Sequence, residues 1–279
     1  MDPSGRRFLV VAVAVIASAL VFALVVPAFT GDRGVAGPTI AAAARPILAI
    51  GALLIAFTVS TGLAAVAGRA ANAVVGIFVV GAGVAILSMR SGTVSDLVFG
   101  EANLRLVALE ALGWTVLVVL ASAAIYRFAG PLPDVPKTFD DDIDSPTGRS
   151  ARISWLAGAL GVVVVWFAAA TLTKGQALGA AVLGGFASGA LGRLLAPRTQ
   201  PVYLAAAPMA AFAAAYGFLA FTLEGNLATG LVDGTLPRLL RVMPTDMAAG
   251  ALAGTALGYG FMRSFVEQKA AQPGVQKRA

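Results

Sequence analysis

Long apolar runs, separated by short clusters of charged and turn-forming residues, constrain this chain more than any other feature of its sequence. Each run has about the length that an α-helix needs to cross the hydrocarbon core of a bilayer, roughly 20 residues. The sequence therefore predicts an all-α polytopic transmembrane helical bundle of about eight spans. The expected spans are residues 8–29, 47–67, 73–89, 104–126, 153–172, 177–195, 202–223 and 247–265.

Composition supports a membrane environment over a soluble one. The chain has 279 residues, of which 58% are hydrophobic and only 12% are charged, whereas about 25% of the residues of soluble proteins are charged. A soluble domain of this size needs a polar shell that these few charges cannot supply. We therefore expect the lipid bilayer to be the main partner of the helices.

The first apolar run, residues 8–29, follows Arg6 and Arg7 and so has the layout of a secretory signal peptide. A signal peptide has a shorter apolar region, of roughly 7–15 residues. This run continues to Pro27 without a convincing small-residue cleavage site. We expect the segment to be retained as a span, with cleavage as the alternative.

The distribution of Lys and Arg predicts the orientation. If the N-terminus is cytoplasmic, 13 of the 20 basic residues fall in the inner segments and 7 in the outer loops. Basic residues are enriched in cytoplasmic loops. The sequence therefore predicts that both termini are cytoplasmic and that the protein is a multi-pass protein of the cell (cytoplasmic or inner) membrane.

Residues 131–152 form a Pro- and Asp-rich segment that divides the chain into two halves of similar layout. Such a composition is typical of an extended, solvated linker. We expect a first membrane half at 1–130, a second at 153–265 and a polar tail at 266–279. Recurring loop lengths suggest that the halves are a parallel repeat, although chance recurrence is the alternative.

Residue types that are missing exclude several kinds of chemistry. The chain has no His and no Cys, which removes imidazole catalysis, thiolate nucleophiles and the usual zinc and haem ligands. The residues Asp140, Asp141 and Asp144 match a magnesium-binding DDxxD pattern, but they lie among prolines in the linker. We expect no catalytic residue, no metal and no cofactor, and no binding of nucleic acid because no basic cluster is interleaved with aromatic residues.

Glu110 is the acidic residue that lies well inside an expected span. An ionised carboxylate in hydrocarbon costs at least a few kcal/mol, so it must be protonated, paired or hydrated. Glu110 is therefore the first candidate for a substrate or ion pathway. The alternative is a carboxylate near the outer interface that pairs with an arginine such as Arg105.

Hydroxyl groups inside apolar helices are further candidates for that pathway. They belong to Thr58, Ser60, Thr61, Thr255 and Tyr259. The alternative is that these groups bond to their own helix or to a neighbouring one.

Glycines recur every four residues in two of the expected spans, at Gly185 and Gly189 and at Gly250, Gly254 and Gly258. Small residues at this spacing allow helix backbones to approach closely. They predict tight packing, either inside the bundle or with another subunit, so a homo-oligomer or a second membrane protein is an expected partner.

Two functional hypotheses follow. The first is permease-like transport of a small solute or ion, based on the two halves, Glu110 and the hydroxyls. The alternative is a non-catalytic assembly or scaffold subunit that acts through helix packing. A membrane enzyme acting on lipids is less favoured, because convergent acid and base groups are missing.

Overall fold

The computed structural model describes residues 3–100, 103–130, 132, 148–197, 201–223 and 226–270. The described chain is all-α, as the sequence predicts, and a single bridge between Thr30 and Ala36 is its only β-type pairing. Seven of its helices have the length and composition needed to cross a membrane. The chain is thus a multi-pass helical bundle.

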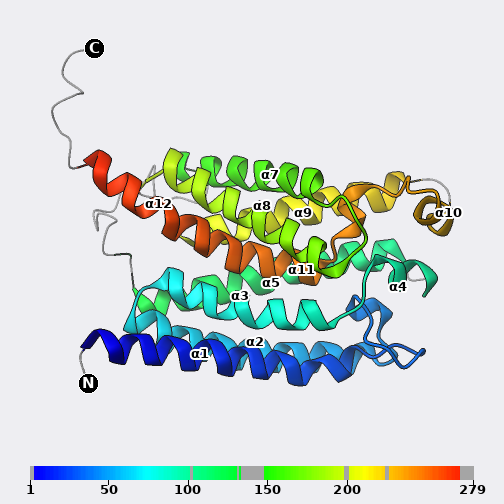
Figure 1. The fold of residues 1–279 in the computed structure, drawn as a ribbon, viewed down its shortest axis with the longest axis horizontal. Coiled ribbons are helices and arrows are strands. Elements are labelled where there is room, and N and C mark those ends of the chain that lie inside the picture. The colour runs from blue at the N-terminus through cyan, green and yellow to red at the C-terminus, as the bar shows by residue number, and fades with distance from the viewer. Residues whose placement is uncertain are drawn as a thin grey trace, which may run out of the picture.

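Four long helices form the first half of the bundle. Short helical turns connect them at one end of the molecule (Figure 1). The elements in chain order are α1 Pro3–Val25, η1 Val26–Phe29, η2 Ile40–Ala42, α2 Pro46–Ala70, α3 Ala73–Arg90, α4 Val94–Phe99 and α5 Leu104–Ala129.

The second half has three long helices and a fourth helical path built from three elements. Its elements are α7 Arg149–Ala168, α8 Lys174–Leu195, α9 Pro201–Thr222, α10 Leu227–Val232, η3 Arg238–Arg241, α11 Pro244–Ala249, the π-helical turn η4 Gly250–Gly254 and α12 Thr255–Ala270. The path from α11 to α12 is the last of the expected spans, and it is not one of the seven continuous candidate spans.

Local sequence explains where these helices begin and end. Pro46 and Pro244 stand at the start of α2 and α11, where a missing N–H costs nothing. The Asn72 side chain accepts a hydrogen bond from the backbone N–H of Val75, 3.1 Å away, and so caps α3. Gly130 ends α5 with a φ of 83°, a conformation that glycine adopts without strain.

The observed helices differ from the expected spans at several ends. Helix α7 ends at Ala168, four residues before the expected end at 172, and α12 continues to Ala270, into the segment expected to be a tail. Residues 133–147 of the expected linker, with the DDxxD pattern, and residues 271–279 lie outside the described part of the chain.

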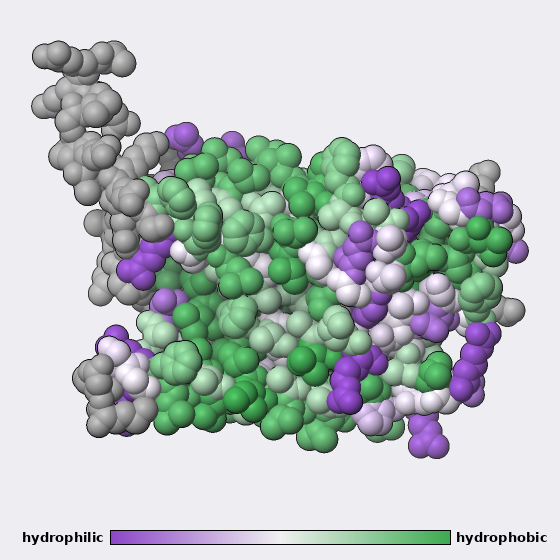
Figure 2. Space-filling view, in the orientation of Figure 1, coloured by the Kyte–Doolittle hydropathy of each residue, from purple (hydrophilic) through white to green (hydrophobic). Residues whose placement is uncertain are grey.

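Exposed side chains show that the bundle surface is apolar. Large hydrophobic residues that are more than half exposed include Phe8, Leu24, Ile47, Leu120 and Phe218. Figure 2 shows hydrophobic residues over the middle of one face, and hydrophilic residues gathered toward its two ends. This distribution suits helices in contact with lipid.

The long helices alternate in direction, so that the start of α1 and the end of α12 lie at the same end of the bundle (Figure 1). We call this the terminal end. The opposite end carries the connections around Gly31, Gly92, Thr171 and Pro237, and we call it the loop end.

Helix packing follows the same scheme in both halves. In the first half α1 packs on α2 and α3, and α2 also packs on α5. In the second half α7 packs on α8 and α9, and α8 also packs on α12. Between the halves, α5 packs on α9 and α3 packs on α11 and η4.

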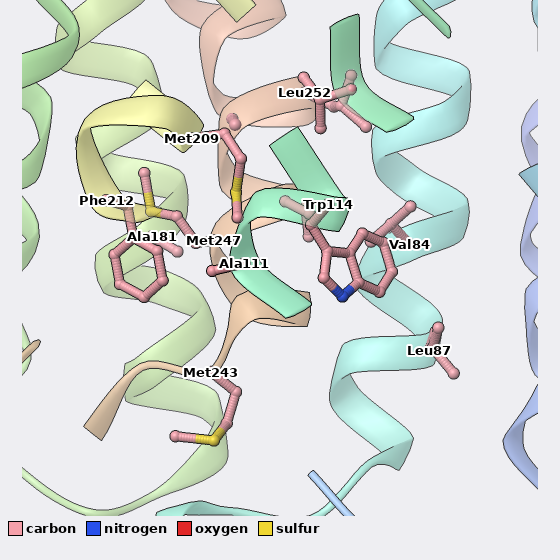
Figure 3. Packing of buried hydrophobic residues seen from close by; sticks show 14 of the residues in the cluster. Val84, Leu87, Ala111, Trp114, Ala181, Met209, Phe212, Met243, Met247 and Leu252 are labelled. Atoms are coloured by element: carbon pink, nitrogen blue, oxygen red, sulfur yellow. The ribbon is translucent and has the colours of Figure 1, made fainter. Parts of the chain in front are cut away.

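The core between the halves is filled by large apolar side chains near its centre (Figure 3). Met209 of α9 and Leu252 of η4 lie there and are fully buried, whereas Trp114 of α5 packs on Phe57 of α2 inside the first half. The interface between the halves is therefore closely packed at this level.

Candidate functional site

A crevice lies between the two halves at the terminal end of the bundle. Its volume is about 690 Å³, and its walls come from α1 and α3 on one side and from α8 and α12 on the other. Figure 2 shows a hollow at this end, between the start of α1 and the end of α12. The lining is Val11, Asn72, Val74, Val75, Phe78, Leu132, Phe186, Ala256, Leu257, Tyr259, Gly260, Phe261 and Arg263.

A buried arginine supports one wall of this terminal crevice. Arg193 is 1% exposed, and its Nη1 donates a hydrogen bond to the Tyr259 hydroxyl, 2.6 Å away. Its guanidinium carbon also lies 4.6 Å from the centre of the Tyr259 ring, which is a cation–π contact. Tyr259, predicted as a pathway residue, thus lines the crevice. It is contacted by the guanidinium of Arg193, which is buried and does not line the crevice.

The loop end of the interface is closed by a buried polar cluster. Asp246 of α11 is fully buried and forms an ion pair with Lys174 of α8, at 2.7 Å. Ser88 of α3 donates a hydrogen bond to the same carboxylate oxygen of Asp246, 2.5 Å away. Lys174 Nζ also donates to the carbonyl oxygen of Gly92, at 3.1 Å. Because Ser88 and Gly92 belong to the first half, this loop-end cluster joins the two halves.

Two further polar groups are buried beside this cluster without a hydrogen-bond partner in the described part of the chain. They are the hydroxyls of Tyr216 in α9 and Thr245 in α11. The Tyr216 hydroxyl is also close enough to the carboxylates of Glu110 and Asp246 to interact with both electrostatically. The interface between the halves therefore holds more polar groups than its hydrogen bonds satisfy.

Glu110 does not lie in the terminal crevice. It lines a groove of about 610 Å³ between α2 and α5, within the first half. Its Oε1 accepts a hydrogen bond from Trp114 Nε1 and its Oε2 accepts one from the backbone N–H of Ala41, both at 3.2 Å. The alternative pairing with Arg105 is not formed, because Arg105 lies over the ring of Phe221.

The groove at Glu110 continues along the same two helices as a second hollow of about 420 Å³. The two hollows share Leu54 and Leu117, so we treat them as one lateral groove. Thr58 and Thr61, predicted as pathway residues, line its second part. The Thr58 hydroxyl donates a hydrogen bond to the carbonyl oxygen of Leu54, 2.8 Å away, as a helix-internal threonine often does.

Two of the other predicted hydroxyls lie between helices. Ser60 of α2 shares a hydrogen bond of 2.6 Å with Ser18 of α1. Thr255 donates to the carbonyl oxygens of Gly185 and Leu204, at 3.2 and 3.4 Å. Ser60 and Thr255 are buried, and neither belongs to the lining of the crevice or of the groove.

The five predicted glycines meet within one chain, where α8 crosses η4 and α12. A Cβ atom at Gly185 would overlap the carbonyl oxygen of Gly250, and one at Gly189 would overlap that of Thr255. The same atom at Gly254 or Gly258 would overlap a carbonyl oxygen of α8, from Val182 or Phe186. These close approaches occur inside the bundle and offer no open glycine face to a partner.

The sequence reasoning missed the loop-end cluster. It assigned Asp246 to an outer loop and Lys174 to the connection before the sixth span, whereas both residues lie in the first turns of helices. A signal was present at Pro244–Asp246, because Pro at the first helical position and Asp at the third are typical of a helix start. The Asp246 carboxylate accepts a hydrogen bond from the Met243 N–H, 2.9 Å away.

The fold and these sites define a multi-pass α-helical membrane protein in which polar groups are buried between the helices. No protein-family model, curated protein or solved structure matches the chain.

Proposed function

We propose that the protein is a permease that moves a small solute or ion along the interface between its two halves. The observation that carries this proposal is the difference between the two ends of that interface. The terminal end has an open crevice, and the loop end is closed by the cluster of Ser88, Lys174 and Asp246. A transporter that alternates between two openings needs this asymmetry in each of its states.

The matching helix pairing in the two halves supports the proposal. In each half the first helix packs on the second and third, and the second packs on the fourth. Across the interface, the third helix of one half packs on the fourth helical path of the other, in both directions. Such a pairing is expected of a parallel repeat related by an axis along the membrane normal, and rocking of the halves about their interface is the usual motion of such proteins.

The nature of the loop-end cluster favours its opening and closing. The cluster joins the halves through two hydrogen bonds, from Ser88 to Asp246 and from Lys174 to the Gly92 carbonyl. If these two hydrogen bonds break as the halves move apart, the ion pair between Lys174 and Asp246 stays intact, because both residues belong to the second half. Opening therefore exposes a paired charge to water and leaves no isolated charge in lipid.

The alternative, an assembly subunit that acts through glycine faces, has less support. Gly185, Gly250 and Gly254 are in contact with backbone atoms of the same chain. A partner that used these glycines would have to displace helices of the bundle itself.

The natural absence of cysteine allows a direct test by single-cysteine labelling in membrane vesicles of both orientations. We expect Val75→Cys and Leu257→Cys in the crevice to react with a membrane-impermeant maleimide from the side of the termini. Leu252→Cys, which replaces a fully buried residue of η4 at the contact with α3, should be unreactive from both sides.

The addition of Asp246→Asn should then make Leu252→Cys reactive from the loop side, because the closure between the halves is weakened. Proteoliposomes tested with a panel of labelled amino acids, sugars and monovalent cations provide the transport readout. The proposal is wrong if Leu257→Cys faces lipid and does not react, or if Leu252→Cys stays unreactive in the Asp246→Asn background.

A further inference from the structure

The Glu110 carboxylate occupies the lateral groove without a cationic partner. Among the described residues, no Lys or Arg forms an ion pair with it. The ion pair between Lys174 and Asp246 lies outside the groove. Both carboxylate oxygens of Glu110 accept an N–H group, from Trp114 and from Ala41. A carboxylate has two lone-pair sites on each oxygen, so each oxygen can accept a further hydrogen bond from a donor in the groove.

The position of Glu110 makes it energetically unfavourable for its carboxylate to carry a charge without a cationic partner. Glu110 lies six residues after the start of α5, which is about 9 Å along the helix axis. Because the groove around it is lined mostly by apolar residues, an unpaired charge on this carboxylate is destabilised. A cation that enters the groove would remove that penalty.

The rest of the groove is apolar and open to lipid. Its walls near Glu110 include Ile50, Leu54, Leu109 and Val116, each of which is between 45% and 62% exposed. The groove continues along α2 and α5 as far as Phe128, toward the terminal end. An elongated apolar group therefore has room along the groove, with one end at the carboxylate.

We propose that the lateral groove binds a single-chain amphiphile with a cationic head, such as a long-chain amine or alkylammonium. The head lies at Glu110 and the alkyl chain lies along the groove between α2 and α5. The site is separate from the terminal crevice, so this inference does not rest on permease activity.

Charge complementarity selects this occupant over other lipids. An alkyl chain gains little when it leaves lipid tails for an apolar groove, because both surroundings are hydrocarbon. The attraction between the carboxylate and a cation is much stronger in this apolar groove than in water, because the local dielectric constant is lower. The head group, and not the chain, therefore decides which amphiphile is bound.

Trp114 provides a local probe of binding, because it lines the groove and donates a hydrogen bond to Glu110. The other two tryptophans, Trp155 and Trp166, are replaced by phenylalanine in the full-length protein. The protein is placed in phosphatidylcholine nanodiscs and titrated with a nitroxide-labelled dodecylamine. Quenching of Trp114 should saturate, and unlabelled dodecyltrimethylammonium should reverse it, whereas dodecyl sulfate and dodecyl maltoside should not.

Two variants separate binding from partition into the bilayer. Glu110→Gln should weaken the saturable quenching by about ten- to hundredfold, as expected for the loss of a charged partner, while Glu110→Asp should retain most of it. Gly113→Leu should abolish it by filling the groove, because Gly113 lines the groove and a Cβ atom there meets nothing within 4 Å. Gly51→Leu is the matched control, since Gly51 is also open but does not line the groove.

The results that overturn the proposal are specific. Quenching that does not saturate, that is equal for cationic and anionic chains, or that is the same in Gly113→Leu and Gly51→Leu would indicate partition into the bilayer. Reversal by added phosphatidylethanolamine at the same concentration as the alkylammonium would assign the groove to a bilayer phospholipid. If Glu110→Gln does not fold, Gly113→Leu still decides between these outcomes.

Discussion

The Ser88 hydroxyl of α3 donates a hydrogen bond to the Asp246 carboxylate of α11 over 2.5 Å, although the two residues are 158 positions apart in the chain. Asp246 is fully buried, and it also accepts from Lys174 and from the Met243 backbone. A single carboxylate thus caps its own helix, neutralises the cation of α8 and joins the two halves at the loop end.

Removal of one partner of this ion pair should destabilise the protein strongly. Asp246→Asn leaves Lys174 without its counter-ion, and Lys174→Met leaves a buried carboxylate unpaired. Each change should lower the free energy of unfolding by about 3–5 kcal/mol. The double variant should recover part of that loss, which can be measured by SDS titration followed by circular dichroism. Additive losses in the double variant would contradict a direct pair.

Two glycines of the same helix should respond in opposite ways to alanine. A Cβ atom at Gly185 overlaps the Gly250 carbonyl oxygen, whereas one at Gly179 meets nothing within 4 Å. We expect Gly185→Ala to lower the free energy of unfolding by about 1–3 kcal/mol through overpacking. Gly179→Ala should be neutral or should stabilise α8 by up to about 1 kcal/mol, because alanine favours the helix. Equal effects in the same SDS titration would mean that α8 and η4 are farther apart.

The two buried tyrosines of the second half should differ when their hydroxyls are removed. The Tyr216 hydroxyl has no hydrogen-bond partner among the described residues, so Tyr216→Phe should leave stability unchanged or raise it by about 1 kcal/mol. The Tyr259 hydroxyl accepts from Arg193, so Tyr259→Phe should lower the free energy of unfolding by about 1–3 kcal/mol. A large loss in Tyr216→Phe would reveal a partner for that hydroxyl.

A bulky residue in the terminal crevice should block it without disturbing the fold. Gly260 lines the crevice, and a Cβ atom there meets nothing within 4 Å. We expect Gly260→Trp to slow the maleimide labelling of Leu257→Cys by at least about tenfold. The free energy of unfolding should stay within about 1 kcal/mol of the parent value. Gly217→Trp is the control, since Gly217 is open and does not line the crevice. Unchanged labelling would mean that Leu257 reaches water by another route.

The class of fold could be predicted from the sequence because lipid imposes a simple rule. A helix that satisfies its own backbone hydrogen bonds is the structure that a long apolar run adopts in a bilayer. The runs at 73–89 and 104–126 therefore match α3 and α5 to within a few residues. Glu110 could also be singled out, because a carboxylate inside such a run is rare.

The sites themselves depend on contacts that no local pattern encodes. The sequence indicated that Glu110 needs a special environment, but the neighbouring helix that supplies it, α2, is decided by packing. Asp246 lies between a polar loop and an apolar run, and hydropathy alone assigned it to the loop. Its burial beside Ser88 and Lys174 follows from the crossing of α3, α8 and α11. The sequence by itself determined that the helices cross a membrane, since hydrophobicity is a property of each segment. Only the tertiary structure decided which polar side chains meet, because those meetings depend on distances between helices far apart in the chain.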